Sequence, residues 1–133
     1  MEIYNLNINT NFNEENLNLT IGNFDGIHNG HQYVIDQLVK TSKTLHYKSC
    51  LLSFMPHPRQ FFSNSLNNNE NFNIITIEAK KEFLKQLGLD VYIDFEFNES
   101  LASLSAEDFI KEILFEKLKI KNIIVGEDFK FGK

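Results

Sequence analysis

One glycine-rich stretch constrains the fold of this chain more than any other. It occupies residues 22–31 and reads GNFDGIHNGH. The alternating residues LNLTI before it predict a β-strand at residues 17–21, and the apolar spacing after it predicts a helix at residues 32–45. Its three glycines permit positive φ angles and close approach to a bound group, while the helix N-terminus presents free N–H groups. The sequence therefore predicts a strand–loop–helix corner that binds an anion.

Two histidines stand at the predicted start of this helix. His28 and His31 are three residues apart, so both imidazoles can reach the same phosphate chain. A metal-binding pair and an ordinary helix cap are the alternatives. A metal site needs further ligands, however, and neither Cys50 nor His57 is spaced to supply one. We therefore expect a phosphate site with no metal ligated directly by the protein.

The rest of the chain alternates between strand-like and helix-like segments. Strands are expected near Ile3 and at residues 48–55, 89–95 and 122–126, with helices at residues 78–87 and from residue 105 onward. Ser105 is predicted to cap the last helix, and Gly88 is predicted to end the helix before it. This alternation predicts an α/β fold, a Rossmann-like parallel sheet with helices on both faces. The carboxyl ends of its strands are expected at one edge.

Size and composition exclude several classes of protein. The 133 residues are enough for one domain with its own core. A formal net charge of −5 without a basic stripe gives no support for nucleic-acid binding. The single cysteine, Cys50, lies in an apolar run, which favours core filling in a reducing compartment. Neither a basic leader nor an apolar run of about eighteen residues occurs, so we expect a cytoplasmic protein without a membrane partner.

Two other unusual stretches end predicted strands, FMPHPR at residues 54–59 and VGEDFKFG at residues 125–132. Together with GNFDGIHNGH, and with SLASLSAEDF at residues 100–109, they resemble the FAD synthetases of bacteria. These are the N-terminal FMN adenylyltransferase modules of bifunctional riboflavin kinase/FMN adenylyltransferases, within the HxGH nucleotidylyltransferase superfamily. The resemblance covers nearly all of residues 17–133. It implies that residues 1–133 are the N-terminal portion of that domain, incomplete at the C-terminus, with the riboflavin kinase domain absent.

The resemblance implies an enzyme of flavin cofactor biosynthesis. The expected reaction is adenylyl transfer from ATP to FMN, giving FAD and pyrophosphate, with Mg²⁺ accompanying ATP. The parent protein would also be a riboflavin kinase. His28 and His31 would hold the triphosphate and stabilise charge on the α-phosphate, which suits a reaction that depends on positioning and positive charge. Asp128 matches a polar residue near the reacting phosphates and would orient them.

Two sets of binding residues follow from the same resemblance. The predicted ATP site consists of Gly22, Asn23, Phe24, Gly26, His28, Gly30 and His31. The predicted flavin site consists of Phe54, Pro56, Pro58, Phe62 and Phe129. Aromatic and proline surfaces suit an isoalloxazine ring, although a place in the core is the alternative for Phe54 and Phe129.

The sequence also departs from the family pattern. Lys130 stands where the family usually has arginine, which removes a planar, bidentate donor. The sequence ends at Lys133, before the family's Ile-Ser-Ser-Thr-x-x-Arg motif. One alternative is therefore a truncated nucleotide- or flavin-binding domain without turnover, and another is a different HxGH nucleotidylyltransferase. An incomplete sheet edge also predicts that copies of the chain associate with one another.

Overall fold

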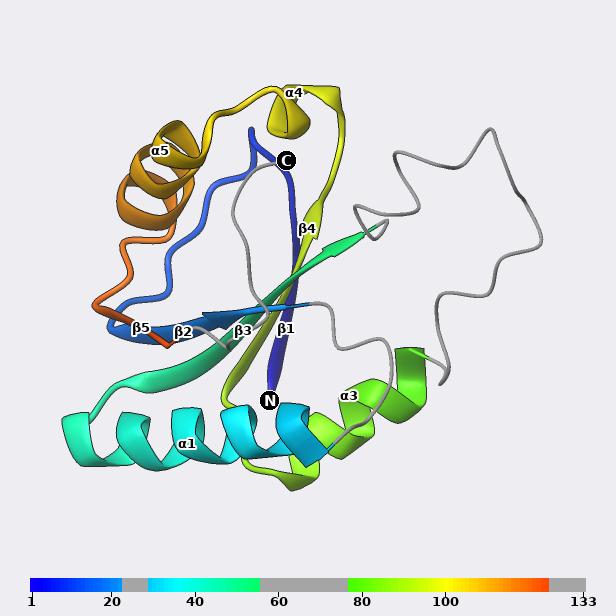
Figure 1. Cartoon of the computed structure of the whole chain (residues 1–133), viewed down its shortest axis with the longest axis vertical. Coiled ribbons are helices and arrows are strands. Elements are labelled where there is room, and N and C mark those ends of the chain that lie inside the picture. Colours follow the sequence, from blue (N-terminus) through cyan, green and yellow to red (C-terminus); the bar gives the residue numbers. More distant parts are fainter. Residues whose placement is uncertain (23–28, 56–76, 125–133) are drawn as a thin grey trace.

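A computed structural model describes the backbone of residues 1–22, 29–55 and 77–124, and the side chains of these residues except 29–31, 55 and 77. From β2 to β5, each strand is followed by one or more helical segments before the next strand begins (Figure 1). The elements are β1 (Glu2–Leu6), β2 (Leu17–Ile21), α1 (Asn29–Leu45), β3 (Lys48–Met55), α3 (Ile77–Gln86), β4 (Val91–Glu96), α4 (Glu99–Ala102), α5 (Ala106–Asp108), the π-helix η1 (Phe109–Lys117) and β5 (Asn122–Ile124).

The strands form one parallel sheet in the order β1-β4-β3-β2-β5. Leu19 of β2 pairs with Cys50 of β3 and with Ile123 of β5, and Phe54 of β3 pairs with Phe95 of β4. Because every pair is parallel, all carboxyl ends of the strands lie at the same edge. This confirms the predicted α/β class and the predicted meeting of strand ends.

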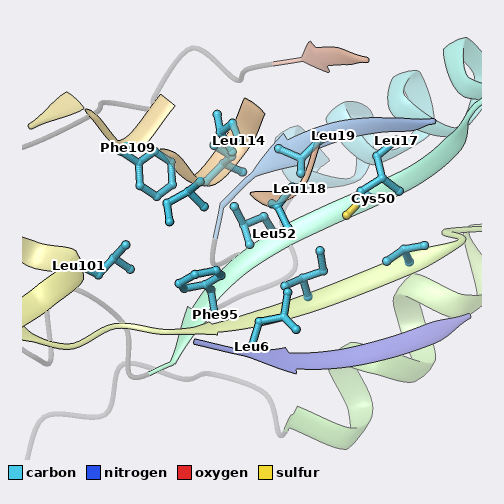
Figure 2. Close-up of a cluster of buried hydrophobic side chains, with 14 residues drawn as sticks. Leu6, Leu17, Leu19, Cys50, Leu52, Phe95, Leu101, Phe109, Leu114 and Leu118 are labelled. Carbon is cyan, nitrogen blue, oxygen red and sulfur yellow. The ribbon is translucent and has the colours of Figure 1, made fainter. Parts of the chain in front are cut away.

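Two hydrophobic clusters cover the two faces of the sheet. The larger one includes Cys50 and Leu52, and residues of α4 and η1 close it (Figure 2). The smaller one includes Leu51 and is closed by α1 and α3. Neighbouring residues of β3 thus serve opposite faces, as the two-residue repeat of a strand requires. Helices on both faces, and Cys50 as a core residue, are both confirmed.

Both faces of β2 are buried, although its alternating sequence is typical of a strand with one solvated face. Asn18 and Thr20 are as inaccessible as the leucines beside them. The Asn18 amide donates to Ser42 Oγ of α1 at 3.0 Å and accepts from Asn122 Nδ2 of β5 at 3.1 Å. Here the polar positions of the alternation face a helix instead of water, and internal hydrogen bonds offset the cost of burying the amide.

The predicted helix boundaries hold at the positions with clear capping chemistry. The Ser105 side chain accepts from the Asp108 N–H at 3.1 Å, and Gly88 ends α3 with a φ of +93°. The short helix α4, capped by Asn98, was not predicted. Helix α1 begins at Asn29, three residues before the predicted start. Within the described ranges, no helix is both long and apolar enough to cross a bilayer.

Candidate functional site at the carboxyl edge of the sheet

The predicted nucleotide corner lies where β2 ends and α1 begins. Gly22 follows β2, and its N–H donates to Leu52 O of β3 at 3.0 Å, which extends the sheet one residue toward the edge. Gly30 and His31 lie in the first turn of α1, which contains no acidic residue. The positive end of this 17-residue helix therefore faces the carboxyl edge without a competing carboxylate of its own. The described start of α1 thus suits a phosphate.

Several predicted site residues lie outside the described part of the chain. They are Asn23, Phe24, Gly26, His28, Pro56, Pro58, Phe62, Asp128, Phe129 and Lys130. Of the predicted ATP residues, the structure brings Gly22, Gly30 and His31 to one edge by their backbone positions. Of the predicted flavin residues it describes Phe54, at the carboxyl end of β3.

Phe54 belongs to an aromatic cluster at this edge, on the face that η1 covers. Its ring lies 5.7 Å from the ring of Phe97 with an interplanar angle of 77°, and 6.0 Å from the ring of Phe109 with an angle of 57°. Phe109 is buried, whereas Phe54 and Phe97 are partly exposed. The two partly exposed rings offer an apolar, polarizable surface of the kind on which a planar aromatic ligand can pack.

Phe97 and Phe109 were not predicted as part of a site. Phe109 lies in the helix that the sequence predicts from residue 105 onward, and its side chain is buried. Phe97 stands one residue beyond the end of β4. An aromatic residue immediately after a parallel strand is the signal that could have indicated it, because ligands of open α/β sheets bind beyond the carboxyl ends of the strands.

Among the described residues, two groups whose pKa values are shifted, Cys50 and Lys117, lie away from this edge. Burial raises the pKa of the Cys50 thiol well above its ordinary value, so this cysteine is not a nucleophile. Lys117 donates to the carbonyl oxygens of Ile8 and Thr10 beside a cavity of about 520 Å³, and burial lowers its pKa. Among the described residues, no three His, Cys, Asp or Glu side chains gather into a possible metal site.

Comparison with known proteins identifies the family. A model of the FAD synthetase family matches residues 10–133, which is nearly the whole chain. The chain belongs to the FAD synthetase family. This confirms the resemblance inferred from the motifs around residues 22–31, 54–59 and 125–132.

Relatives of this FAD synthetase family member carry the name bifunctional riboflavin kinase/FMN adenylyltransferase. The protein from Buchnera aphidicola subsp. Schizaphis graminum is 43% identical over 114 residues, which cover 86% of this chain and 36% of the relative. The Pseudomonas fluorescens protein is 36% identical, over 85% of this chain and 35% of the relative. The Escherichia coli K12 protein is 30% identical, over 90% of this chain and 37% of the relative. The chain thus spans about a third of the length of these relatives.

A solved structure shares the fold. A crystal structure from Streptococcus pneumoniae, named as that of a macrolide-efflux protein, superposes with a TM-score of 0.77 at 23% identity. The match covers 98% of this chain and 50% of the other chain. At this identity the likeness supports the α/β architecture of the FAD synthetase family member and carries no argument about its activity.

Proposed function

We propose that this chain transfers the adenylyl group of ATP to the phosphate of FMN, giving FAD and pyrophosphate. The observation that carries the proposal is the match of the FAD synthetase family to residues 10–133. Relatives named as FMN adenylyltransferases at 30–43% identity give further support. The other activity in their name, riboflavin kinase, is proposed for the longer proteins and is not assigned to residues 1–133.

In the proposed reaction, an FMN phosphate oxygen attacks the α-phosphorus of ATP. The new P–O bond forms as the bond between the α-phosphorus and the bridging oxygen breaks, and pyrophosphate leaves with the electron pair. The attacking oxygen is already an anion, so no general base is required. His28 and His31 would donate to the triphosphate as charge builds, next to the N–H groups at the start of α1. Asp128 would orient the reacting groups, and Mg²⁺ bound with ATP would offset phosphate charge.

The two substrates would meet at the carboxyl edge of the sheet. The nucleotide would lie over Gly22, Asn23, Phe24, Gly26 and Gly30, where backbone N–H groups can approach its phosphates. FMN would lie against Phe54, together with Pro56, Pro58, Phe62 and Phe129. The partly exposed rings of Phe54 and Phe97 support this placement, since they are apolar surface at the end of β3 and β4.

Incubation of the chain with FMN, ATP and Mg²⁺, followed by chromatography for FAD, tests the proposal. We expect FAD from the unmodified chain and none above background from a variant with His28→Ala and His31→Ala. His46→Asn is a matched control, because this exposed histidine follows the other end of α1 with a φ of +60°, which asparagine tolerates. Quenching of flavin fluorescence without FAD would instead support a binding domain without turnover. The absence of both FAD and flavin quenching would contradict the proposal.

Location and association are also proposals. We place the reaction in the cytoplasm, which fits a free cysteine kept buried as a thiol. We also propose that two copies associate through a sheet edge, because β1 and β5 border the described sheet.

A further inference from the structure

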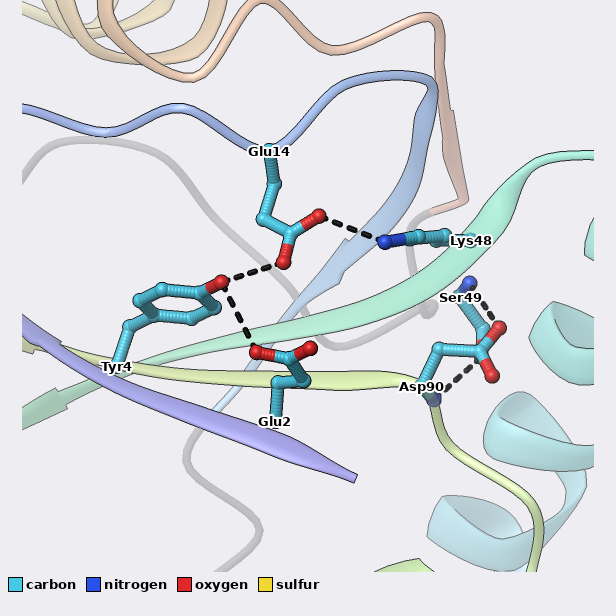
Figure 3. A network of polar contacts seen from close by, with 6 residues as sticks. All are labelled: Glu2, Tyr4, Glu14, Lys48, Ser49 and Asp90. Carbon is cyan, nitrogen blue, oxygen red and sulfur yellow. Dashed lines mark hydrogen bonds and ion pairs between the residues drawn. The ribbon is translucent and has the colours of Figure 1, made fainter.

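Two serine–aspartate pairs link β3 to β4 and to Asp90, the residue just before β4. The register that pairs Cys50 with Val91 also pairs Ser53 with Asp94 and places Ser49 beside Asp90. At the amino end, Asp90 Oδ2 accepts from the Ser49 N–H at 3.0 Å and lies 3.2 Å from the Ser49 hydroxyl (Figure 3). The Asp90 N–H donates back to Ser49 Oγ at 2.9 Å. This reciprocal pair is complete in itself.

The pair at the carboxyl end is not complete. The Ser53 hydroxyl donates to Asp94 Oδ1 at 2.8 Å, and the Tyr92 hydroxyl lies 3.1 Å from Ser53 Oγ, where it can donate in turn. Asp94 is only 8% exposed. Within the described ranges, Ser53 is the one hydrogen-bond or ion-pair partner of this carboxylate, and none reaches its second oxygen. A carboxylate has room for about four hydrogen bonds, so Ser53 holds this one in place and its second oxygen is open to a further donor.

The pair of Ser53 and Asp94 lies on strands next to the start of the nucleotide corner at Gly22. Gly22 N–H bonds to the carbonyl of Leu52, the residue before Ser53, so Gly22, Ser53 and Asp94 cross the sheet near its carboxyl edge. All three belong to the face that α1 and α3 cover. Side chains two residues apart on a strand share a face, and Leu51 and Tyr92, two residues before Ser53 and Asp94, pack in the smaller hydrophobic cluster with α1 and α3. Thr20 of β2 stands in the same relation to Gly22, the residue just after this strand. Gly22 has no side chain to occupy the space beside Ser53.

We propose that Asp94 accepts hydrogen bonds from vicinal hydroxyls of a substrate at this edge. The inference rests on the proposed function, because ATP carries such hydroxyls on its ribose and FMN on its ribityl chain. An acidic residue near the carboxyl end of a strand is a suitable acceptor for sugar hydroxyls in α/β folds. A phosphate would be repelled by the carboxylate, and one half-occupied carboxylate is too few ligands for a metal ion. Ser53 and Tyr92 act as positioning residues that fix its orientation.

Dissociation constants of ATP with Mg²⁺ and of FMN, measured by calorimetry and flavin fluorescence for Asp94→Asn, test this inference. We expect the affinity for one substrate to fall about 10- to 100-fold, the effect of losing a hydrogen bond to a charged group. The analogues identify the source: 2′-deoxy- and 3′-deoxy-ATP remove ribose hydroxyls, and lumiflavin lacks the ribityl chain. The loss should vanish with the analogue that lacks the contacted hydroxyls. Asp90→Asn, at the closed pair, should change neither affinity by more than about twofold.

Unchanged affinity of a folded Asp94→Asn variant for both substrates would overturn the inference and leave the proposed function intact. Failure of the unmodified chain to bind either ATP or FMN would count against the inference and against the proposed function. Should Asp94→Asn not fold, Ser53→Ala keeps the carboxylate and releases its orientation. The Ser53→Ala variant should lose affinity for the same substrate but not for the analogue that lacks the contacted hydroxyls. An equal loss for the substrate and its analogue would contradict the role assigned to Asp94.

Discussion

Glu14 ties the N-terminal segment to the start of β3. Its carboxylate accepts from Lys48 Nζ at 2.8 Å and from the Tyr4 hydroxyl (Figure 3). The hydrogen bond from Lys48, followed by that from Tyr4, holds the pKa of Glu14 below its ordinary value of 4.5. Because the folded state lowers this pKa, the contribution of Glu14 to stability is complete above about pH 4.5 and is lost as the pH falls through the folded value.

Urea unfolding of Glu14→Gln at two pH values checks this assignment. At pH 7 we expect the variant to have the lower free energy of unfolding. At pH 3 the difference from the unmodified chain should shrink, since this pH lies below the ordinary pKa of 4.5 and the unfolded chain then binds the proton. A difference of the same size at both pH values would show that the carboxylate charge has no part in the effect.

Phe54 is the one residue of the proposed flavin site that the structure describes. Phe54→Leu keeps an apolar side chain in the cluster but removes the ring that we propose to pack on the flavin, so we expect FMN affinity to fall about 10-fold while ATP affinity is unchanged. Phe115→Leu is the control, because this ring is 59% exposed on η1. Equal FMN affinity in both variants would contradict a flavin contact at Phe54.

At the scale of single residues, the sequence predicts the role of a side chain better than it predicts which residues that side chain contacts. The apolar run around Cys50 was enough to predict a core thiol, and Ser105 was recognisable as a cap from Asp108 three residues later. The partners of Phe54 were not predictable, because Phe97 follows β4 and Phe109 begins η1, and both meet Phe54 only in the folded chain. The open carboxylate of Asp94 depends in the same way on the register of two strands.

Among the elements, α3 is followed by Gly88, a residue whose backbone suits the turn that stops the helix. Gly88 has a φ of +93°, and a Cβ built there would lie 3.5 Å from Val39 Cγ1, an ordinary contact. The cost of Gly88→Ala is therefore backbone strain without a clash, and we expect a loss of about 1 kcal/mol in the free energy of unfolding. Lys85→Ala, on the exposed side of the same helix, is the control. An unchanged midpoint of urea unfolding for Gly88→Ala would contradict this account.

The type of the last helix was harder to predict than its existence. Its buried residues Phe109, Ile113, Leu114 and Leu118 repeat every four to five positions. That spacing is wider than an α-helix prefers and fits the i→i+5 hydrogen bonds of a π-helix, as in the bond from Leu118 N–H to Ile113 O at 2.9 Å. The sequence predicts a helix from residue 105 onward but not its π type, which is rare. Helix α4 was missed because its four residues are too short for a periodic pattern.

For the whole molecule, the order of the strands leaves β1 and β5 at the borders of the described sheet. Unpaired strand edges favour pairing with a second copy, so we expect the weight-average mass in sedimentation equilibrium to rise with concentration. Monomer at every concentration up to about 0.5 mM would contradict the proposed association. The α/β class and the common edge of strand ends were predictable from alternation alone, whereas the order β1-β4-β3-β2-β5 depends on long-range pairing.

The central claim is that this chain transfers the adenylyl group itself, and labelled ATP tests it most directly. The chain is incubated with FMN, Mg²⁺ and ATP labelled at either the α- or the γ-phosphate, and FAD and pyrophosphate are separated. The account predicts α-label in FAD and γ-label in pyrophosphate, both lost in the double histidine variant. Label from γ-phosphate in a flavin product, or α-label remaining in ATP while FMN is bound, would contradict it.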